Sequence, residues 1–265
     1  MIGDGMIRLG LGLGLGLTQQ GIKALPPEPV IDGAMVLNID TNLASGATIE
    51  LPLSGTVDCT VYWGDWSTPT AATEAGDVSH TYARPGTYTI QIDGDLTSFG
   101  DGATWTGADM LTSVTTFGTV GITALPGAFY GASNLTAIPS NVTGVTDISD
   151  MLHDATSYNG TELATWDITS LTNASNALDG CGLEPDHYNT IIMSWADQVA
   201  TNSDLPASIT LGADGLWWGN VEYDGYEHAD TDTARSYLTT TAGWTISDDT
   251  EAMVLAFNTT LETGT

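Results

Sequence analysis

The sequence predicts a mainly β protein with short helices. Its expected parts are an N-terminal extended arm, a small antiparallel β-sandwich, and a short repeat solenoid with a helical C-terminal cap. Three patterns predict this fold class. Leucine alternates with glycine over residues 9–17. Short runs of alternating apolar and polar residues follow, separated by turn residues, over residues 31–96. Beyond residue 96 one set of apolar spacings recurs three times, which indicates repeats.

The composition limits the class of protein and its partners. The chain has 265 residues, of which 42% are hydrophobic, enough for one large core or two modest ones. It carries 33 acidic residues against 4 Lys and Arg, a net charge of −29. The basic residues are scattered, so we predict no nucleic-acid binding. The Leu-Gly stretch over residues 9–17 is too short to span a bilayer, and we predict no membrane insertion. Such acidity is typical of solubility in a salty medium, and attraction to a basic partner or to divalent cations is the alternative.

Residues 1–30 are interpreted as a docking arm with a proline linker. Side chains alternate along an extended chain, so five leucines share one face and glycines leave the other face as bare backbone. Such a strand can add to the edge of a partner's sheet. The linker around Pro26, Pro27 and Pro29 is expected to be stiff and extended. The predicted docking residues are Leu9, Leu11, Leu13, Leu15 and Leu17.

Residues 31–96 have the pattern of several short strands. Apolar and polar residues alternate at 35–39, 48–53, 57–63 and 88–92. Turn residues such as Gly, Pro and Asp separate these runs. Short strands at this spacing favour a small antiparallel sandwich.

Two segments of this region carry a more specific motif. They are Trp63-Gly64-Asp65 and the run SHTYARPGTYTI from Ser79 to Ile90. These segments resemble the polycystic-kidney-disease (PKD) type of immunoglobulin-like domain, which has a W-G-D-G turn and an H-T-Y-x-x-P-G-T-Y-T-V strand pair. In this chain Trp66 stands where the family has its second glycine. The resemblance implies an immunoglobulin-like sandwich in which His80 is structural.

Three sets of apolar residues recur beyond residue 96, each spaced by three and four residues and each followed by a small residue. The spacing suits a short helical turn. Such a unit cannot bury its apolar face alone, so neighbouring units must stack. Cys181 takes the small position and Cys59 an inward strand position, so we expect two buried thiols and no disulfide. The sets are Ile122, Leu125, Phe129 and Ala132; Val145, Ile148, Leu152 and Ala155; and Leu171, Ala174, Leu178 and Cys181.

Segments within these repeats include FYGAS at 129–133, MLHDATSYNG at 151–160 and WDITSLT at 166–172. They resemble the BspA-like leucine-rich repeats, typified by M-F-x-G-A-x-x-F-N-x-x-L-x-x-W-D-x-S-x-V-T-x-M. The stretch that begins at Leu183 resembles that family's closing repeat, with a helix opened by Pro185. The resemblance implies a solenoid over residues 97–250, followed by a C-terminal tail over residues 251–265.

The sequence contains no recognisable catalytic motif. It has no zinc-ligand spacing, no nucleophile elbow and no phosphate-binding loop. We therefore predict a protein that is not an enzyme and has no cofactor. The one metal candidate is a calcium site at Asp93, Asp95 and Asp101, which lacks the Glu that closes an EF-hand loop.

An aromatic insertion interrupts the predicted closing repeat. Trp217, Trp218, Tyr223 and Tyr226 lie close together in a glycine-containing segment. Such rings can stack on sugars or anchor a protein interface, which makes them candidate recognition residues. The alternative is that they cover the end of the solenoid.

Together these parts suggest a modular structural protein. Small immunoglobulin-like and BspA-like modules occur on bacteriophage particles and on bacterial surfaces. The first hypothesis is a multi-copy virion protein, a capsid decoration, head fibre or tail appendage. Its arm would dock on other virion proteins and its modules would contact a host glycan or protein. The second is a BspA-like adhesin of the bacterial cell surface, and the third is a secreted glycan-active enzyme.

Overall fold

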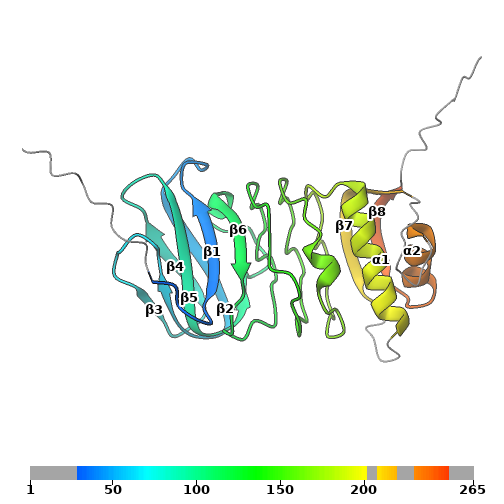
Figure 1. Cartoon of the computed structure of the whole chain (residues 1–265), viewed down its shortest axis with the longest axis horizontal. Helices are drawn as coiled ribbons and strands as arrows, with labels where there is room; N and C mark the ends of the chain where they lie inside the picture. Colours follow the sequence, from blue (N-terminus) through cyan, green and yellow to red (C-terminus); the bar gives the residue numbers. More distant parts are fainter. Residues whose placement is uncertain (1–28, 202–207, 220–229, 251–265) are drawn as a thin grey trace, which may run out of the picture.

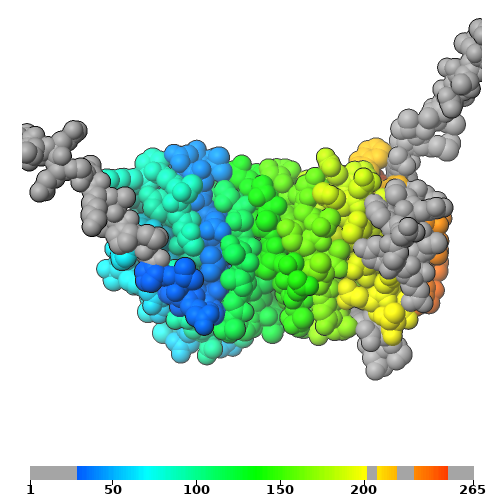
Figure 2. All heavy atoms as spheres, in the orientation of Figure 1, coloured from blue at the N-terminus to red at the C-terminus, as the bar shows by residue number. Residues whose placement is uncertain are grey.

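The computed structural model describes residues 29–201, 208–219 and 230–250 of the chain. These residues form an elongated body with an antiparallel sheet at one end and two helices at the other (Figure 1). The prediction of a mainly β protein with short helices is confirmed at this level. In Figure 2 the colours from green to orange follow one another along the long axis, so beyond the sheet each part of the chain packs chiefly against its neighbours in sequence. Within the sheet the order differs, because β1 (Met35–Asp40, blue in Figure 1) lies next to β6 (Leu111–Thr116, green).

Six strands form the sheet, and β2 pairs with three of the others. The strand order is β3-β2-β5-β1-β6, and β4 also pairs with β2. The long strand β2 pairs with β4 through residues 48–53 and with β5 through residues 53–62. The strands are β1 (Met35–Asp40), β2 (Thr48–Tyr62), β3 (Thr70–Ala72), β4 (Gly76–Thr81), β5 (Thr87–Phe99) and β6 (Leu111–Thr116).

The sheet extends beyond the boundary predicted at residue 96. Strand β5 continues to Phe99, and β6 joins the sheet by pairing with β1. The short 3₁₀ helix η1 (Ala108–Met110) connects the two strands. The apolar residues of β6, Leu111 and Val114, are three positions apart and do not alternate. Its strand pairing therefore depends on β1, the first strand in the described part of the chain, and has no local pattern.

Parallel bridges continue from the sheet into the second half of the chain. Ser113 of β6 bridges to Ala137. Further bridges join successive segments, and those between the predicted repeats follow the same offsets as the apolar sets. We call the segments around residues 124, 147, 173 and 211 the stack. Its bridges join Ser98 to Ala124, Ala124 to Asp147, Asp147 to Asn173, and Ala174 to Leu211.

The backbone conformation repeats along the stack. Left-handed residues recur at the same offsets, and each column contains glycine together with Asp or Asn, which tolerate this conformation best. In the first column φ is 65°, 53° and 56°, and in the second it is 71°, 56° and 66°. The columns are Gly127, Asp150 and Asn176, and Gly131, Asp154 and Gly180.

The predicted apolar sets form the core of the stack. Eleven of the twelve residues are buried, and Ile122 is half-buried. The spacing of three and four residues reflects single hydrogen-bonded turns and not helix, because N–H groups donate to the carbonyl three residues earlier. Examples are Ala128 to Leu125, Met151 to Ile148, and Ala177 to Ala174.

Two helices and a parallel strand pair close the far end of the stack. The predicted helix at Pro185 is confirmed as α1, which buries Tyr188, Ile191, Ile192 and Trp195. Trp195 Nε1 donates to the carbonyl of Leu163 in the 3₁₀ helix η2 (Glu162–Thr165). The closing elements are α1 (Pro185–Thr201), β7 (Thr210–Trp218), α2 (Thr231–Thr240) and β8 (Thr245–Thr250), with β7 and β8 parallel.

Candidate functional site

The predicted recognition residues fall partly within the structure. Trp217 and Trp218 end strand β7, whereas Tyr223 and Tyr226 lie outside the described residues. The five predicted docking leucines of the arm, and the tail over residues 251–265, lie outside them too.

Trp217 is presented to solvent at the helical end of the molecule. Its exposed fraction is 45%, which puts it among the few large apolar residues of the described chain with such exposure. In the register of the parallel pair it lies opposite Asp249 of β8. An exposed indole on a strand is a large contact surface with few rotatable bonds, which suits an interface or the face of a sugar ring.

The ring of the neighbouring Trp218 packs against Arg235, which forms an ion pair with Asp248. The guanidinium carbon of Arg235 lies 5.2 Å from the Trp218 ring centroid, within cation–π range. Arg235 Nε lies 3.1 and 3.0 Å from the two carboxylate oxygens of Asp248. Trp218 is therefore part of a cluster with Arg235 and Asp248, and the exposed Trp217 is its neighbour in the sequence.

Asp248 connects this cluster to helix α1. The Tyr188 hydroxyl donates to Asp248 Oδ2 over 2.8 Å, and the Asp248 side chain is fully buried. Burial, followed by the nearby Asp248 charge, raises the pKa of Tyr188 well above its ordinary value. The hydrogen bonds to Asp248 raise the pKa of Arg235. The cluster thus holds one negative and one positive charge, with Tyr188 as a neutral donor.

The structure does not bring the three calcium-candidate residues together. Asp93 and Asp95 lie on β5, opposite Thr60 and Asp58 of β2. Asp101 instead accepts a hydrogen bond from the backbone N–H of Ala103. Across the described ranges, no three His, Cys, Asp or Glu side chains gather where they could hold a metal ion.

The motif around Trp63 forms a linked aromatic cluster. The His80 ring stacks on Trp63 with centroids 4.7 Å apart, and its Nε2 lies 2.9 Å from Asp65 Oδ2. The Tyr82 hydroxyl donates to the Trp63 carbonyl over 2.9 Å. The His80 ring also meets the Tyr82 ring edge-on at 4.6 Å, so its contacts agree with the structural role expected for it. Trp66 has a φ of 62°, the left-handed conformation that glycine adopts freely at such a turn.

Both cysteines are buried and free, as predicted. Burial raises the pKa of Cys181 to about 12. Burial, with the Asp58 charge, also raises the pKa of Cys59. Both thiols are therefore protonated at neutral pH and act as small apolar side chains.

Sequence reasoning missed the Arg235–Asp248 pair behind the tryptophans. The sequence feature that could have indicated this pair is the scarcity of positive charge. Arg235 is one of only four Lys and Arg residues in a chain of net charge −29. A lone basic residue in such a chain is a good candidate for a specific partner.

No family model matches the chain, and no curated protein or solved structure shows significant similarity to it. In the described part of the chain, neither helix has the length and apolar character required to span a bilayer.

Proposed function

We propose that this protein is a non-enzymatic structural component of a bacteriophage particle, present in many copies. In this proposal the arm docks the protein on other capsid or tail proteins, and the opposite end contacts a glycan or protein of the host surface. The sheet is a PKD-like immunoglobulin sandwich, and the stack is a short BspA-like leucine-rich-repeat solenoid with a helical cap. The recurrence of left-handed residues at repeat offsets supports the second assignment.

The observation that carries the proposal is the separation of the two ends. The first described residues are fixed to the sheet, because Gln91 bonds both the Pro29 carbonyl and the Ile31 N–H. Val30 beside them is 87% exposed. Trp217 lies on β7, at the helical end of the long axis (Figure 1). A protein tethered through residues 1–30 therefore presents Trp217 far from its attachment point.

Docking is tested by deleting residues 1–24 and measuring incorporation into particles by mass spectrometry. The deletion is expected to leave the sheet and stack folded, with an unchanged circular dichroism spectrum, and to abolish incorporation. Normal incorporation of the shortened protein would contradict docking by the arm. Detection of the protein in the cell envelope and not in particles would instead favour the alternative, a BspA-like adhesin of the bacterial surface.

Recognition is tested with two exposed tryptophans at opposite ends. Trp217→Ala should reduce attachment to host cells with little change in melting temperature, because the side chain is 45% exposed. Trp66→Ala is the matched control, since Trp66 is 48% exposed but lies in the turn after β2. Equal effects of the two changes on attachment would refute a specific role for Trp217.

A further inference from the structure

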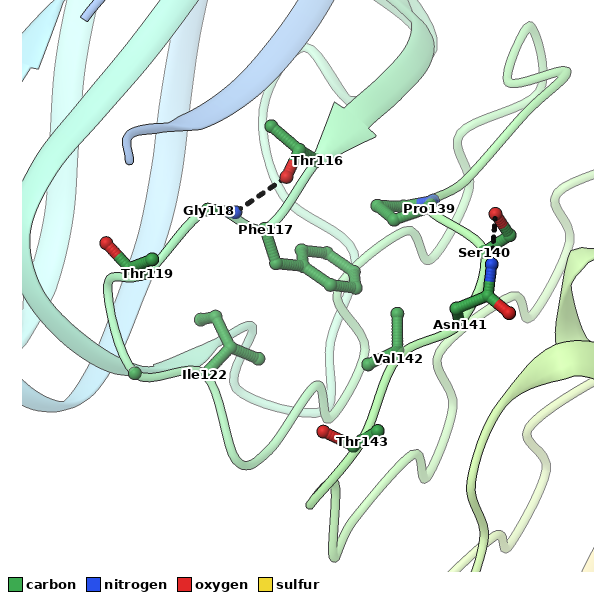
Figure 3. A pocket seen from close by; sticks show the side chains of 11 residues that line it. Thr116, Phe117, Gly118, Thr119, Ile122, Pro139, Ser140, Asn141, Val142 and Thr143 are labelled. Carbon is green, nitrogen blue, oxygen red and sulfur yellow. Dashed lines mark hydrogen bonds between the residues drawn. The ribbon is translucent and has the colours of Figure 1, made fainter. Parts of the chain in front are cut away.

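A groove opens between two loops near the junction of the sheet and the stack (Figure 3). It lies between residues 116–122 and residues 139–143, and its volume is about 320 Å³. The two loops occupy equivalent positions in successive segments. Gly118 and Asn141 have the same left-handed conformation, with φ of 61° and 55°.

The two loops that border the groove form backbone hydrogen bonds to different neighbours, the first to the sheet and the second to the next segment of the stack. Thr119 N–H donates to the Gly33 carbonyl over 2.7 Å, which draws the first loop back onto the sheet. The Val142 carbonyl accepts from Asp167 N–H over 2.8 Å, which draws the second loop toward the next segment. Asn141 N–H also bonds forward, to Thr165 Oγ1. The gap between the loops is therefore held open by the backbone.

The floor of the groove is apolar and rigid. Phe117, 8% exposed, stacks parallel to Phe129 with centroids 6.5 Å apart and meets the Trp166 ring edge-on at 6.1 Å. Half-buried Ile122 and Val142 flank it on the two loops (Figure 3). Because the Phe117 ring packs against both the Phe129 and the Trp166 rings, the apolar floor is already formed without a ligand.

The rim is polar but carries no charge. Ser140, Asn141 and Thr143 are exposed on one side, and Thr119 is exposed on the other. Asn141 Nδ2 donates to Ser140 Oγ over 3.2 Å, which orients the amide along the rim. None of the eleven lining residues is ionisable, although the chain holds 33 acidic residues. The groove therefore has a neutral lining in a strongly acidic protein.

We propose that this groove binds one unit of a neutral saccharide. Hydroxyl and amide groups at the rim can both donate to and accept from sugar hydroxyls, and the apolar floor fits the C–H face of a sugar ring. An anion is disfavoured by the net charge of −29, and a cation would find no carboxylate in the lining. The volume lies at the lower end of the range for small-ligand sites, which limits the ligand to about one sugar unit.

The test uses the full chain and ligand-observed saturation-transfer NMR. The probes are glucose, galactose, mannose and N-acetylglucosamine at millimolar concentration, with N-acetylneuraminic acid as the anionic comparison. At least one neutral sugar is expected to receive saturation and the anionic sugar is not. Absence of transfer to all four neutral sugars, or equal transfer to the anionic one, overturns the proposal.

Two matched variants locate the binding. Asn141→Gly keeps the left-handed backbone and removes the rim amide, and it should weaken binding about tenfold, the upper end for one neutral hydrogen bond. Asn176→Gly is the control, because Asn176 is also exposed, with a φ of 56°, but lies outside the groove. Equal affinities of the two variants would place the binding elsewhere.

Trp217→Ala separates this site from the recognition end. Any part of the sugar signal that comes from Trp217 should disappear in that variant, and the part that Asn141→Gly weakens should remain. Loss of the whole NMR signal in Trp217→Ala would assign the sugar to the tryptophan and overturn the groove proposal.

Discussion

Arg235 on α2 and Asp248 on β8 meet through two guanidinium nitrogens. Besides the Nε contacts, Arg235 Nη2 donates to Asp248 Oδ1 over 2.5 Å. The Asp248 side chain is fully buried, and the Tyr188 hydroxyl fills a further acceptor position. The pair therefore joins both helices to the last strand of the structure.

Removal of Arg235 should strongly destabilise the helical end. Arg235→Ala leaves the buried Asp248 carboxylate without its counter-charge, at a cost of about 3 kcal/mol. Arg84→Ala is the control for loss of a positive charge, because Arg84 is exposed. Its effect should stay within about 0.5 kcal/mol. Urea unfolding measures both, and similar values would show that the ion pair contributes nothing specific.

Two tyrosines test how burial changes the contribution of a hydrogen bond to the free energy of unfolding. Tyr82 donates to the Trp63 carbonyl in the interior, and Tyr88 donates to the Arg84 carbonyl at the surface. Tyr82→Phe should lower the free energy of unfolding by about 1–2 kcal/mol, because a buried acceptor loses its donor. Tyr88→Phe should cost less than about 0.5 kcal/mol, since water replaces the hydroxyl. The reverse order would contradict the observed geometry.

Asp65 should make the sheet sensitive to acid. Burial raises the pKa of Asp65, but hydrogen bonds from Ser67 and His80 together outweigh it and leave the pKa below its ordinary 3.8. The stabilisation is therefore complete above the ordinary value and lost as the pH falls through the lowered one.

The measurement is urea unfolding between about pH 2 and pH 6, across the window where an Asp carboxyl titrates. Asp65→Asn should flatten the fall in stability at the acid end of this range. Glu74→Gln, in the exposed loop between β3 and β4, controls for loss of one negative charge. An NMR titration midpoint of Asp65 above 3.8 would reverse the expected sign.

Asp154 tests the equivalence of the stacked segments. Its φ of 56° matches those of Gly131 and Gly180 in the same column. Asp154→Gly and Asp154→Ala remove the same charge but differ at the β-carbon, which the left-handed conformation disfavours. The Gly variant should be more stable by about 1 kcal/mol in thermal or urea unfolding. An Ala variant of equal stability would mean that the column does not require this conformation.

Buried positions could be predicted from the sequence wherever apolar residues recur at a regular spacing. The apolar sets of the stack, the inward Cys59 and the apolar face of α1 all follow from spacing, because side-chain direction is set by local backbone geometry. Pairings between distant residues could not be predicted this way. Strand β6 pairs with β1, although the other four strands of the sheet lie between them in the sequence, and its apolar residues do not alternate.

The same limit applies to the two candidate sites. Sequence placed Trp217 and Trp218 in one aromatic insertion but did not separate the exposed ring from the one against Arg235. That difference depends on how α2 docks beside β8. The groove depends on Thr119 bonding back to Gly33, at the start of the sheet, while Val142 bonds forward. Neither contact leaves a trace in the local pattern.

The bridges between successive segments have a mechanical consequence. Hydrogen bonds between neighbouring strands point across the strands, and the segments succeed one another along the long axis. A pull applied at both ends of the molecule therefore stretches these bonds one row after another. A released segment, such as that from Ala124 to Asp147, extends to about 80 Å at full stretch of the backbone. Under tension the body would lengthen in steps set by the length of each segment, so each segment would absorb work before the next one unfolded.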